Sequence, residues 1–373
     1  MRILWHAWRS VWRRSIGLAV IAALACTAAE AGSLRTNRAK ALVPLDEIIS
    51  GGPPPDGIPP IDRPAFVTPA DASGWLKPKE PVLALTVDGD ARAYPLQILM
   101  WHEIVNDVVG GVPVAVTFCP LCNSALVFER RVDGTTLDFG TSGMLFKSDL
   151  VMYDRQSHSL WAQMEGRAIV GDRAGQRLRL RPANTIAFEA WRSAHPDGKV
   201  LSRDTGHRRR YGVNPYESYD EPSLGPFLYR GKLDPRRPPK ERVVGVAVGE
   251  ARRAYPFPLL EKRRVVHDTV GEQAIVIFYE PGTLSALDDT EIAKSRAVGA
   301  TSVFRAQLGE RTLTFEATPG GFQDRQTGSR WDFFGAALSG PLAGQRLTPV
   351  QHVDAFWFAW AAFNPSTTVW TAP

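Results

Sequence analysis

Residues 114–120 read VAVTFCP, an apolar run of the kind that forms a buried β-strand, and the run ends in a cysteine and a proline. Residues 274–281 read AIVIFYEP and repeat the run without the cysteine. Other matches keep the same order along the chain: 93–95 with 254–256, 106–110 with 267–271, 126–139 with 302–315, 154–161 with 324–331, and 191–196 with 360–365. Because so many matches share one order, we interpret the chain as two tandem, diverged copies of one domain.

Each copy predicts a fold of short strands and a few short helices. In the first copy we expect strands at 82–87 and 112–118, a helix that begins at Pro95, and a hairpin around Asp133-Gly134. A helix over 185–194, capped by Asn184, closes the copy. The predicted class is α+β with a mainly antiparallel sheet that could curl into a barrel.

Composition divides the chain into five parts. We expect a signal peptide over 1–31, a Pro/Gly-rich arm over 32–81, the first repeat over 82–202, a linker over 203–242 and the degenerate second repeat over 243–373. The first 31 residues carry four arginines and one glutamate, so they supply +3 of the net charge of +5. The charge of the remainder is too weak to argue for nucleic acid as a partner, and we expect none.

The N-terminal segment predicts export. Arg13-Arg14 precedes an apolar stretch over 16–25, and Ala29-Glu30-Ala31 has small residues where a signal peptidase would cut. A twin-arginine signal and a lipoprotein site at Cys26 stay open as variants. The expected location is therefore the periplasm or the exterior. Any membrane association would come only through this segment, as an anchor if it is not cleaved.

The candidate site centres on Cys119-Pro120-Leu121-Cys122, which lies between two predicted strands. A thioredoxin-like pair would open a helix, whereas a tight turn between strands is typical of a metal-binding knuckle. We predict a copper or zinc ion held by both cysteines and His102, with His158 or Met144 as a fourth ligand. Further candidates for a pocket are Asn106, Asp107, Ser124, Met144, Ser148 and Asp149.

The second copy provides an internal control for this site. At the positions of Cys119, Cys122 and His102 it has Glu280, Thr283 and Arg263, while the apolar framework survives. Because all three residues are replaced together, we interpret them as one functional unit and not as residues that serve only the fold. The competing interpretation is a structural disulfide and an unrelated core histidine that drifted separately.

Several of these motifs carry a resemblance to a known family. Residues 102–107 (HEIVND), 114–122, 148–155 (SDLVMYDR) and 160–161 resemble the bacterial domain-of-unknown-function family 3179, with Asn123 where that family usually has glycine. The resemblance implies an exported or membrane-linked bacterial protein and no established activity.

Three functions remain as hypotheses from the sequence. The first is an exported metal-binding protein, whose partner is a metal ion or a small molecule. The second is a thiol–disulfide oxidoreductase in which Cys119 attacks. The third is a non-catalytic binding or scaffold protein with a structural disulfide.

Overall fold

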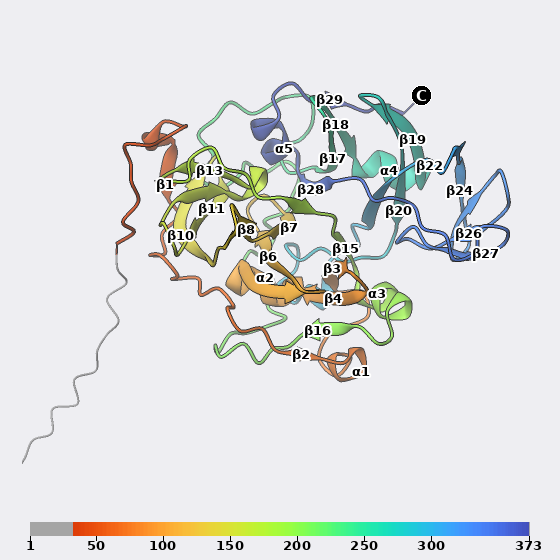
Figure 1. Ribbon diagram of the computed structural model, residues 1–373, viewed down its shortest axis with the longest axis horizontal. Helices are drawn as coiled ribbons and strands as arrows, with labels where there is room; N and C mark the ends of the chain where they lie inside the picture. Colours follow the sequence, from red (N-terminus) through yellow and green to blue (C-terminus); the bar gives the residue numbers. More distant parts are fainter. Residues whose placement is uncertain (1–32, 373) are drawn as a thin grey trace, which may run out of the picture. The chain divides into compact units, whose positions relative to one another are not determined.

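A computed structural model describes residues 33–372, and the predicted signal peptide lies outside this range. The described chain is mostly antiparallel β-sheet with five short α-helices, which confirms a β-rich α+β class (Figure 1). Within residues 33–372, no helix is long and apolar enough to cross a membrane.

Three sheets belong to the first half of the chain. The first contains β1 (Ile48–Ser50), β10 (Phe139–Phe146), β11 (Asp149–Asp154), β12 (Leu160–Ala162) and β13 (Arg167–Val170). The second contains β14 (Leu180–Arg181), β7 (Ser124–Glu129), β6 (Val112–Cys119) and β5 (Ile104–Val109). The third contains β15 (Asn184–Ala187), β3 (Pro81–Val87), β4 (Asp90–Pro95), β16 (Lys199–Leu201) and β2 (Phe66–Val67). All three have open strand orders, so the described strands close no barrel.

The second half has a similar set of elements. One sheet contains β28 (His352–Phe356), β17 (Arg242–Val248), β18 (Ala251–Pro256) and β29 (Thr368–Val369), and another β19 (Val265–Val270), β20 (Gln273–Glu280) and β21 (Ala300–Arg305). A third contains β24 (Phe315–Thr318), β25 (Gly321–Asp324), β26 (Arg330–Trp331) and β27 (Ala337–Ser339). Two small hairpins complete the strands, β8 (Arg131–Val132) with β9 (Thr135–Thr136) and β22 (Gln307–Leu308) with β23 (Arg311–Thr312).

The helices are short and sit where the chain leaves a strand. They are α1 (Pro69–Ala72), α2 (Leu96–His102), α3 (Phe188–Ala194), α4 (Phe257–Arg263) and α5 (Trp357–Phe363). Pro95 is the N-cap residue of α2, so the helix begins at Leu96, one residue later than predicted. The predicted cap Asn184 is instead the first residue of β15, because residues 184–187 pair with β3 before the helix begins.

Matching elements in the two halves have equal lengths. β3, β4, α2, β5 and β6 contain 7, 6, 7, 6 and 8 residues. β17, β18, α4, β19 and β20 contain 7, 6, 7, 6 and 8 residues as well. The repeated Asp-Arg-Gln motif also has one structure, since Trp161 and Trp331 each donate a 2.9 Å hydrogen bond from Nε1 to Asp154 and Asp324 respectively. The duplication itself stays a prediction.

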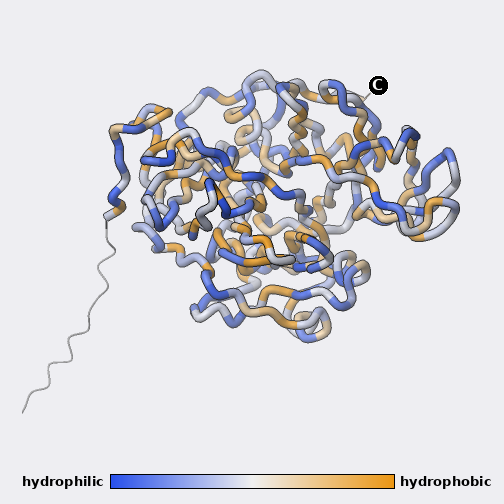
Figure 2. The backbone as a smooth tube through the Cα atoms, viewed as in Figure 1, coloured by the Kyte–Doolittle hydropathy of each residue, from blue (hydrophilic) through white to orange (hydrophobic). Residues whose placement is uncertain are grey.

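The two halves share a core. One buried apolar cluster joins residues of β5, β6 and β7 to residues of β28 and α5. Figure 2 shows orange apolar stretches that alternate with blue hydrophilic ones along the folded chain. The Phe356 N–H donates a 2.9 Å hydrogen bond to the carbonyl oxygen of Cys122. The second half therefore contacts the backbone of the cysteine turn directly.

The arm and the linker both reach the first half. β1 of the arm pairs with β10, and the linker residue Tyr219 donates a 3.2 Å hydrogen bond to the carbonyl oxygen of Leu121. Ser148, which precedes β11, donates from Oγ to the carbonyl oxygen of Phe227 at 2.5 Å. These contacts bring the arm, the β10–β11 hairpin and the linker together around the cysteine turn.

Candidate metal centre

The two cysteines lie in a tight turn between strands, as the sequence predicts. Cys119 is the last residue of β6 and pairs with Ser124, the first residue of β7. The turn is closed by hydrogen bonds from Cys122 N to the Cys119 carbonyl and from Asn123 N to the Pro120 carbonyl, both 3.2 Å. Asn123 has φ 51°, a conformation that asparagine tolerates better than most residues. Both thiols are buried and are not joined by a disulfide.

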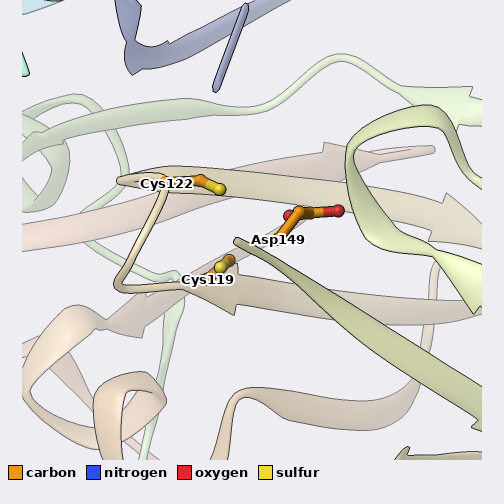
Figure 3. A group of neighbouring side chains, drawn as sticks. All are labelled: Cys119, Cys122 and Asp149. Carbon is orange, nitrogen blue, oxygen red and sulfur yellow. The ribbon is translucent and has the colours of Figure 1, made fainter. Parts of the chain in front are cut away.

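Asp149 brings a carboxylate to the same point. It is the first residue of β11 and follows Lys147 and Ser148, which both have positive φ (54° and 67°) and turn the chain inward. The ligand atoms of Cys119, Cys122 and Asp149 all lie within 4.8 Å of one another, and Figure 3 shows the three side chains converging. Three potential ligands from two different hairpins therefore meet in one place.

One oxygen of Asp149 has only the two thiols as possible hydrogen-bond donors. Oδ2 accepts a 2.8 Å hydrogen bond from Met164 N, whereas Oδ1 is buried and accepts no hydrogen bond from a nitrogen or hydroxyl of the described residues, so the Cys119 and Cys122 thiols are the donors left to face this carboxylate. A buried carboxylate oxygen without a nitrogen or hydroxyl donor is costly, and proteins usually satisfy such an atom with water, a proton or a cation. Oδ1 thus points to a missing partner at this site.

The electrostatics agree with this geometry. Burial raises the pKa of Asp149 to about 7. Burial, and then the nearby Asp149 carboxylate, raises the pKa of Glu103 to about 8. Burial also raises the pKa of both thiols. None of the leading causes of these four shifts is a lysine or arginine, and no ion pair joins Glu103 or Asp149 to a cation among residues 33–372.

In the second half, the positions equivalent to Glu103 and Cys119 form an ion pair. By strand register, Arg264 and Glu280 occupy the positions of Glu103 and Cys119: Phe118 N bonds to the Glu103 carbonyl and Tyr279 N to the Arg264 carbonyl, both at 2.8 Å. Arg264 and Glu280 are paired at 3.5 Å. The hairpin β24–β25 is also shorter than β10–β11 and has no strand segment equivalent to the one that begins with Asp149.

The structure does not bring His102 to the cysteines. The carbonyl oxygen of Pro59 lies 2.7 Å from His102 Nδ1, so Nδ1 is the protonated nitrogen that donates. Nε2 accepts from the Tyr211 hydroxyl at 2.6 Å, so neither nitrogen has a free lone pair. Burial lowers the pKa of His102 to about 4. His158 is not in the cluster either, since its Nδ1 accepts a hydrogen bond from Arg35 N at 3.2 Å.

The predicted pocket residues separate into two groups. Asn106 donates to Asp62 and Phe139, Asp107 binds Arg92 and Tyr94, and Ser124 donates to Gln163, so these three serve the fold. Asp149, Met144 and Ser148 lie at or beside the site: Asp149 belongs to the cluster, Met144 lines the adjoining cavity and the Ser148 carbonyl faces Cys122 Sγ at 3.5 Å. Sequence reasoning missed Glu103, although it directly follows His102 in the HEIVND motif.

The donor set fits a transition-metal ion. Two thiolates and a carboxylate are ligands that zinc accepts in tetrahedral sites, and three protein ligands leave a fourth position open. The short turn presents both sulfurs from one side, and the β10–β11 hairpin presents the carboxylate from the other.

A family model described as "Protein of unknown function (DUF3179)" matches residues 55–367. The chain belongs to the DUF3179 family. This confirms the resemblance seen in the motifs, and the match spans the cysteine turn, Asp149, the linker and most of the second half. No curated protein and no solved structure matches this DUF3179 chain.

Proposed function

We propose that this DUF3179 protein is an exported metal-binding protein that holds one zinc ion through Cys119, Cys122 and Asp149. The observation that carries the proposal is the cluster itself: a buried carboxylate lies within 4.8 Å of both sulfurs, and its Oδ1 accepts no hydrogen bond from a nitrogen or hydroxyl of the described residues. A divalent cation would satisfy this oxygen and balance the thiolate and carboxylate charges, which no described cation balances.

The donor set favours zinc over copper. Copper(I) is selected by soft thiolate and thioether ligands, whereas a carboxylate oxygen is a hard ligand that zinc accepts readily. Met144 lines the cavity beside the site, but no described contact joins it to the sulfurs. His102 drops out of the proposed ligand set because both ring nitrogens are engaged.

The chemistry follows from the open position. A zinc ion with three protein ligands acts as a Lewis acid toward a molecule in its fourth position. The chain itself contributes a buried acidic group: Glu103 is 8% exposed, and in the metal-free chain burial, and then Asp149, raises the pKa of its carboxyl group to about 8. We therefore favour a catalytic or ligand-binding metal site over a purely structural one.

The thiol–disulfide alternative receives less support. An attacking cysteine needs an exposed thiol with a lowered pKa, usually beside a cation or at a helix N-terminus. Cys119 and Cys122 are 2% and 0% exposed, and burial raises the pKa of each thiol. They also lie between strands and not at a helix N-terminus.

Metal analysis of the purified full-length chain tests the proposal. We expect about one zinc per chain in the wild type and little in Cys119→Ser, Cys122→Ser or Asp149→Asn. His102→Asn is the matched control, because a histidine outside the cluster should leave the zinc content unchanged. Wild-type protein that takes up no zinc, or Asp149→Asn protein that binds zinc with undiminished affinity, would refute it. Copper held in preference to zinc would refute the metal assignment.

Two features of the chain complete the proposal. Equal element lengths in the two halves support a duplication in which only the first copy keeps the site. The basic and apolar pattern of residues 1–31 supports export, with a periplasmic or extracellular site. Sequencing the N-terminus of the mature protein tests the export part, which predicts a start near residue 32.

A further inference from the structure

The linker carries half of the large apolar side chains that are exposed on the described part of the chain. Eight such side chains are exposed within residues 33–372, and four of them fall within ten consecutive positions: Leu224, Phe227, Leu228 and Leu233. Their exposed fractions are 51%, 51%, 38% and 38%. A concentration of this kind on a protein surface often marks a place that another molecule covers.

Two contacts fix this segment to the body of the protein and leave its apolar side chains at the surface. The Phe227 carbonyl accepts the hydrogen bond from the Ser148 hydroxyl, and the Tyr229 ring packs against the Phe358 ring with centroids 5.4 Å apart. Between these two anchors, Leu228 has φ 53°, a conformation that a leucine rarely adopts. The fold therefore holds an exposed leucine in a strained backbone conformation, which is a feature that clusters at functional sites.

The charge of the segment restricts the surface that it can fit. Residues 223–233 contain two cations, Arg230 and Lys232, and no acid. Both cationic side chains are exposed, and neither forms a hydrogen bond or an ion pair within residues 33–372. Asp234, the next acid along the chain, is already paired with Arg236 at 2.6 Å. Unpaired cations among exposed apolar side chains match the anionic headgroups and the adjoining acyl chains of a membrane.

The backbone of the segment favours a lipid surface over a protein partner. Residues 223–233 contain no helix and no strand, so they offer neither a sheet edge nor a helix face to a partner chain. A bilayer interface needs no such complementary surface, because large apolar side chains enter it individually while basic side chains remain among the headgroups.

We infer that residues 223–233 dock on an anionic membrane surface. The four exposed apolar side chains enter the outer part of the acyl layer, and Arg230 and Lys232 contact the lipid phosphates. This attachment goes beyond the proposed zinc site and does not depend on it, and it adds a second contact to the anchor that residues 1–31 would provide.

A fluorophore on the linker tests the inference in the full-length chain. Cys119 and Cys122 are 2% and 0% exposed, so an added surface cysteine in a Cys26→Ser background takes an environment-sensitive NBD label selectively. With phosphatidylcholine vesicles that contain phosphatidylglycerol, we expect the label on Leu224→Cys to shift its emission to the blue and to be quenched by brominated acyl chains. Leu338→Cys is the matched control: it is 63% exposed in the second half, and its label should stay in water even if residues 1–31 hold the chain on the vesicle.

Two further variants of the labelled protein test the chemistry of the contact. Leu233→Asp should raise the lipid concentration at the half-maximal shift about tenfold, and Arg230→Glu/Lys232→Glu should do so at least about tenfold with an unchanged thermal transition. A label at 224 that stays in water, or equal quenching at 224 and 338, would overturn the inference. Equal shifts with pure phosphatidylcholine would overturn the anionic assignment. A blue shift that grows with protein concentration without vesicles would assign the segment to a second copy of the chain and overturn the membrane contact.

Discussion

Ser148 and Phe227 connect the metal-site hairpin to the linker: the Ser148 hydroxyl donates a 2.5 Å hydrogen bond to the Phe227 carbonyl. Ser148 directly precedes Asp149, and Phe227 lines the adjoining cavity. The linker is thus tied to the residue that directly precedes the carboxylate, beside the buried thiols.

The first prediction concerns this hydrogen bond. Ser148→Ala should lower the free energy of unfolding by about 1 kcal/mol and speed the reaction of the thiols with a maleimide, because the linker then opens more often. Labelling kinetics followed by mass spectrometry measures this rate. Ser223→Ala, on the exposed part of the same linker, is the control and should label at the wild-type rate. Equal rates for Ser148→Ala and wild type would contradict the role of the hydrogen bond.

The second prediction concerns pH. Burial lowers the pKa of His102 to about 4, below its usual 6.5, so the unfolded chain binds the proton more readily between these values. The contribution of His102 to stability is therefore present above pH 6.5 and is lost as the pH falls toward 4, by up to about 3 kcal/mol.

Urea unfolding of wild-type and His102→Gln protein across this pH range measures the effect. Other buried groups titrate in the same window, so the difference between the two proteins is the quantity of interest. We expect the wild type to lose its advantage as the pH falls. A pH-independent difference would show that His102 titrates normally.

The third prediction uses the repeated tryptophan motif. Trp161→Phe and Trp331→Phe each remove the Nε1 donor from a fully buried aspartate, Asp154 or Asp324. Each change should cost about 1–3 kcal/mol, because a charged acceptor loses one of its donors. Chemical denaturation provides the measurement. Since both sites share one geometry, costs that differ by more than about twofold would argue against equivalent packing in the two halves.

The fourth prediction compares the equivalent positions Arg264 and Glu103. Arg264→Met should lower the free energy of unfolding by about 1 kcal/mol, because Glu280 loses its ion partner. In metal-free protein, Glu103→Gln should cost nothing or stabilise the fold, since the carboxyl group it replaces has no partner among the described residues. Thermal unfolding in the presence of a chelator distinguishes the two. A marked loss of stability in Glu103→Gln would reveal a partner for this carboxyl group.

Local sequence patterns predicted much of the fold. The apolar run that ends at Cys119 is strand β6, the cysteines do lie in a turn, and the hairpin around Asp133-Gly134 is present as β8 and β9. Asn184 was wrong as a helix cap because pairing with β3 extends residues 184–187 as a strand, a tertiary effect that a cap signal does not report.

The ligand set could be predicted only in part, because it depends on distant pairings. The two cysteines are close in sequence, so their turn is a local property. Asp149 belongs to a separate hairpin, whose turn brings its carboxylate to the two cysteines. No residue pattern near Asp149 in the sequence predicts that the two hairpins lie this close together. His102 ends a helix beside the cysteines' strand, but Pro59 of the arm and Tyr211 of the linker hold its ring nitrogens. Such partners lie 43 and 109 residues away.

The hydrogen bond from Phe356 to Cys122 gives the cysteine-free half a structural role at the cysteine turn. A chain ending before residue 243 would remove this backbone donor from the cysteine turn and expose the apolar faces of β6 and β7 to solvent. The C-terminal half would then serve as a permanent support for the first half, and gene fragments encoding the N-terminal half alone should yield insoluble protein.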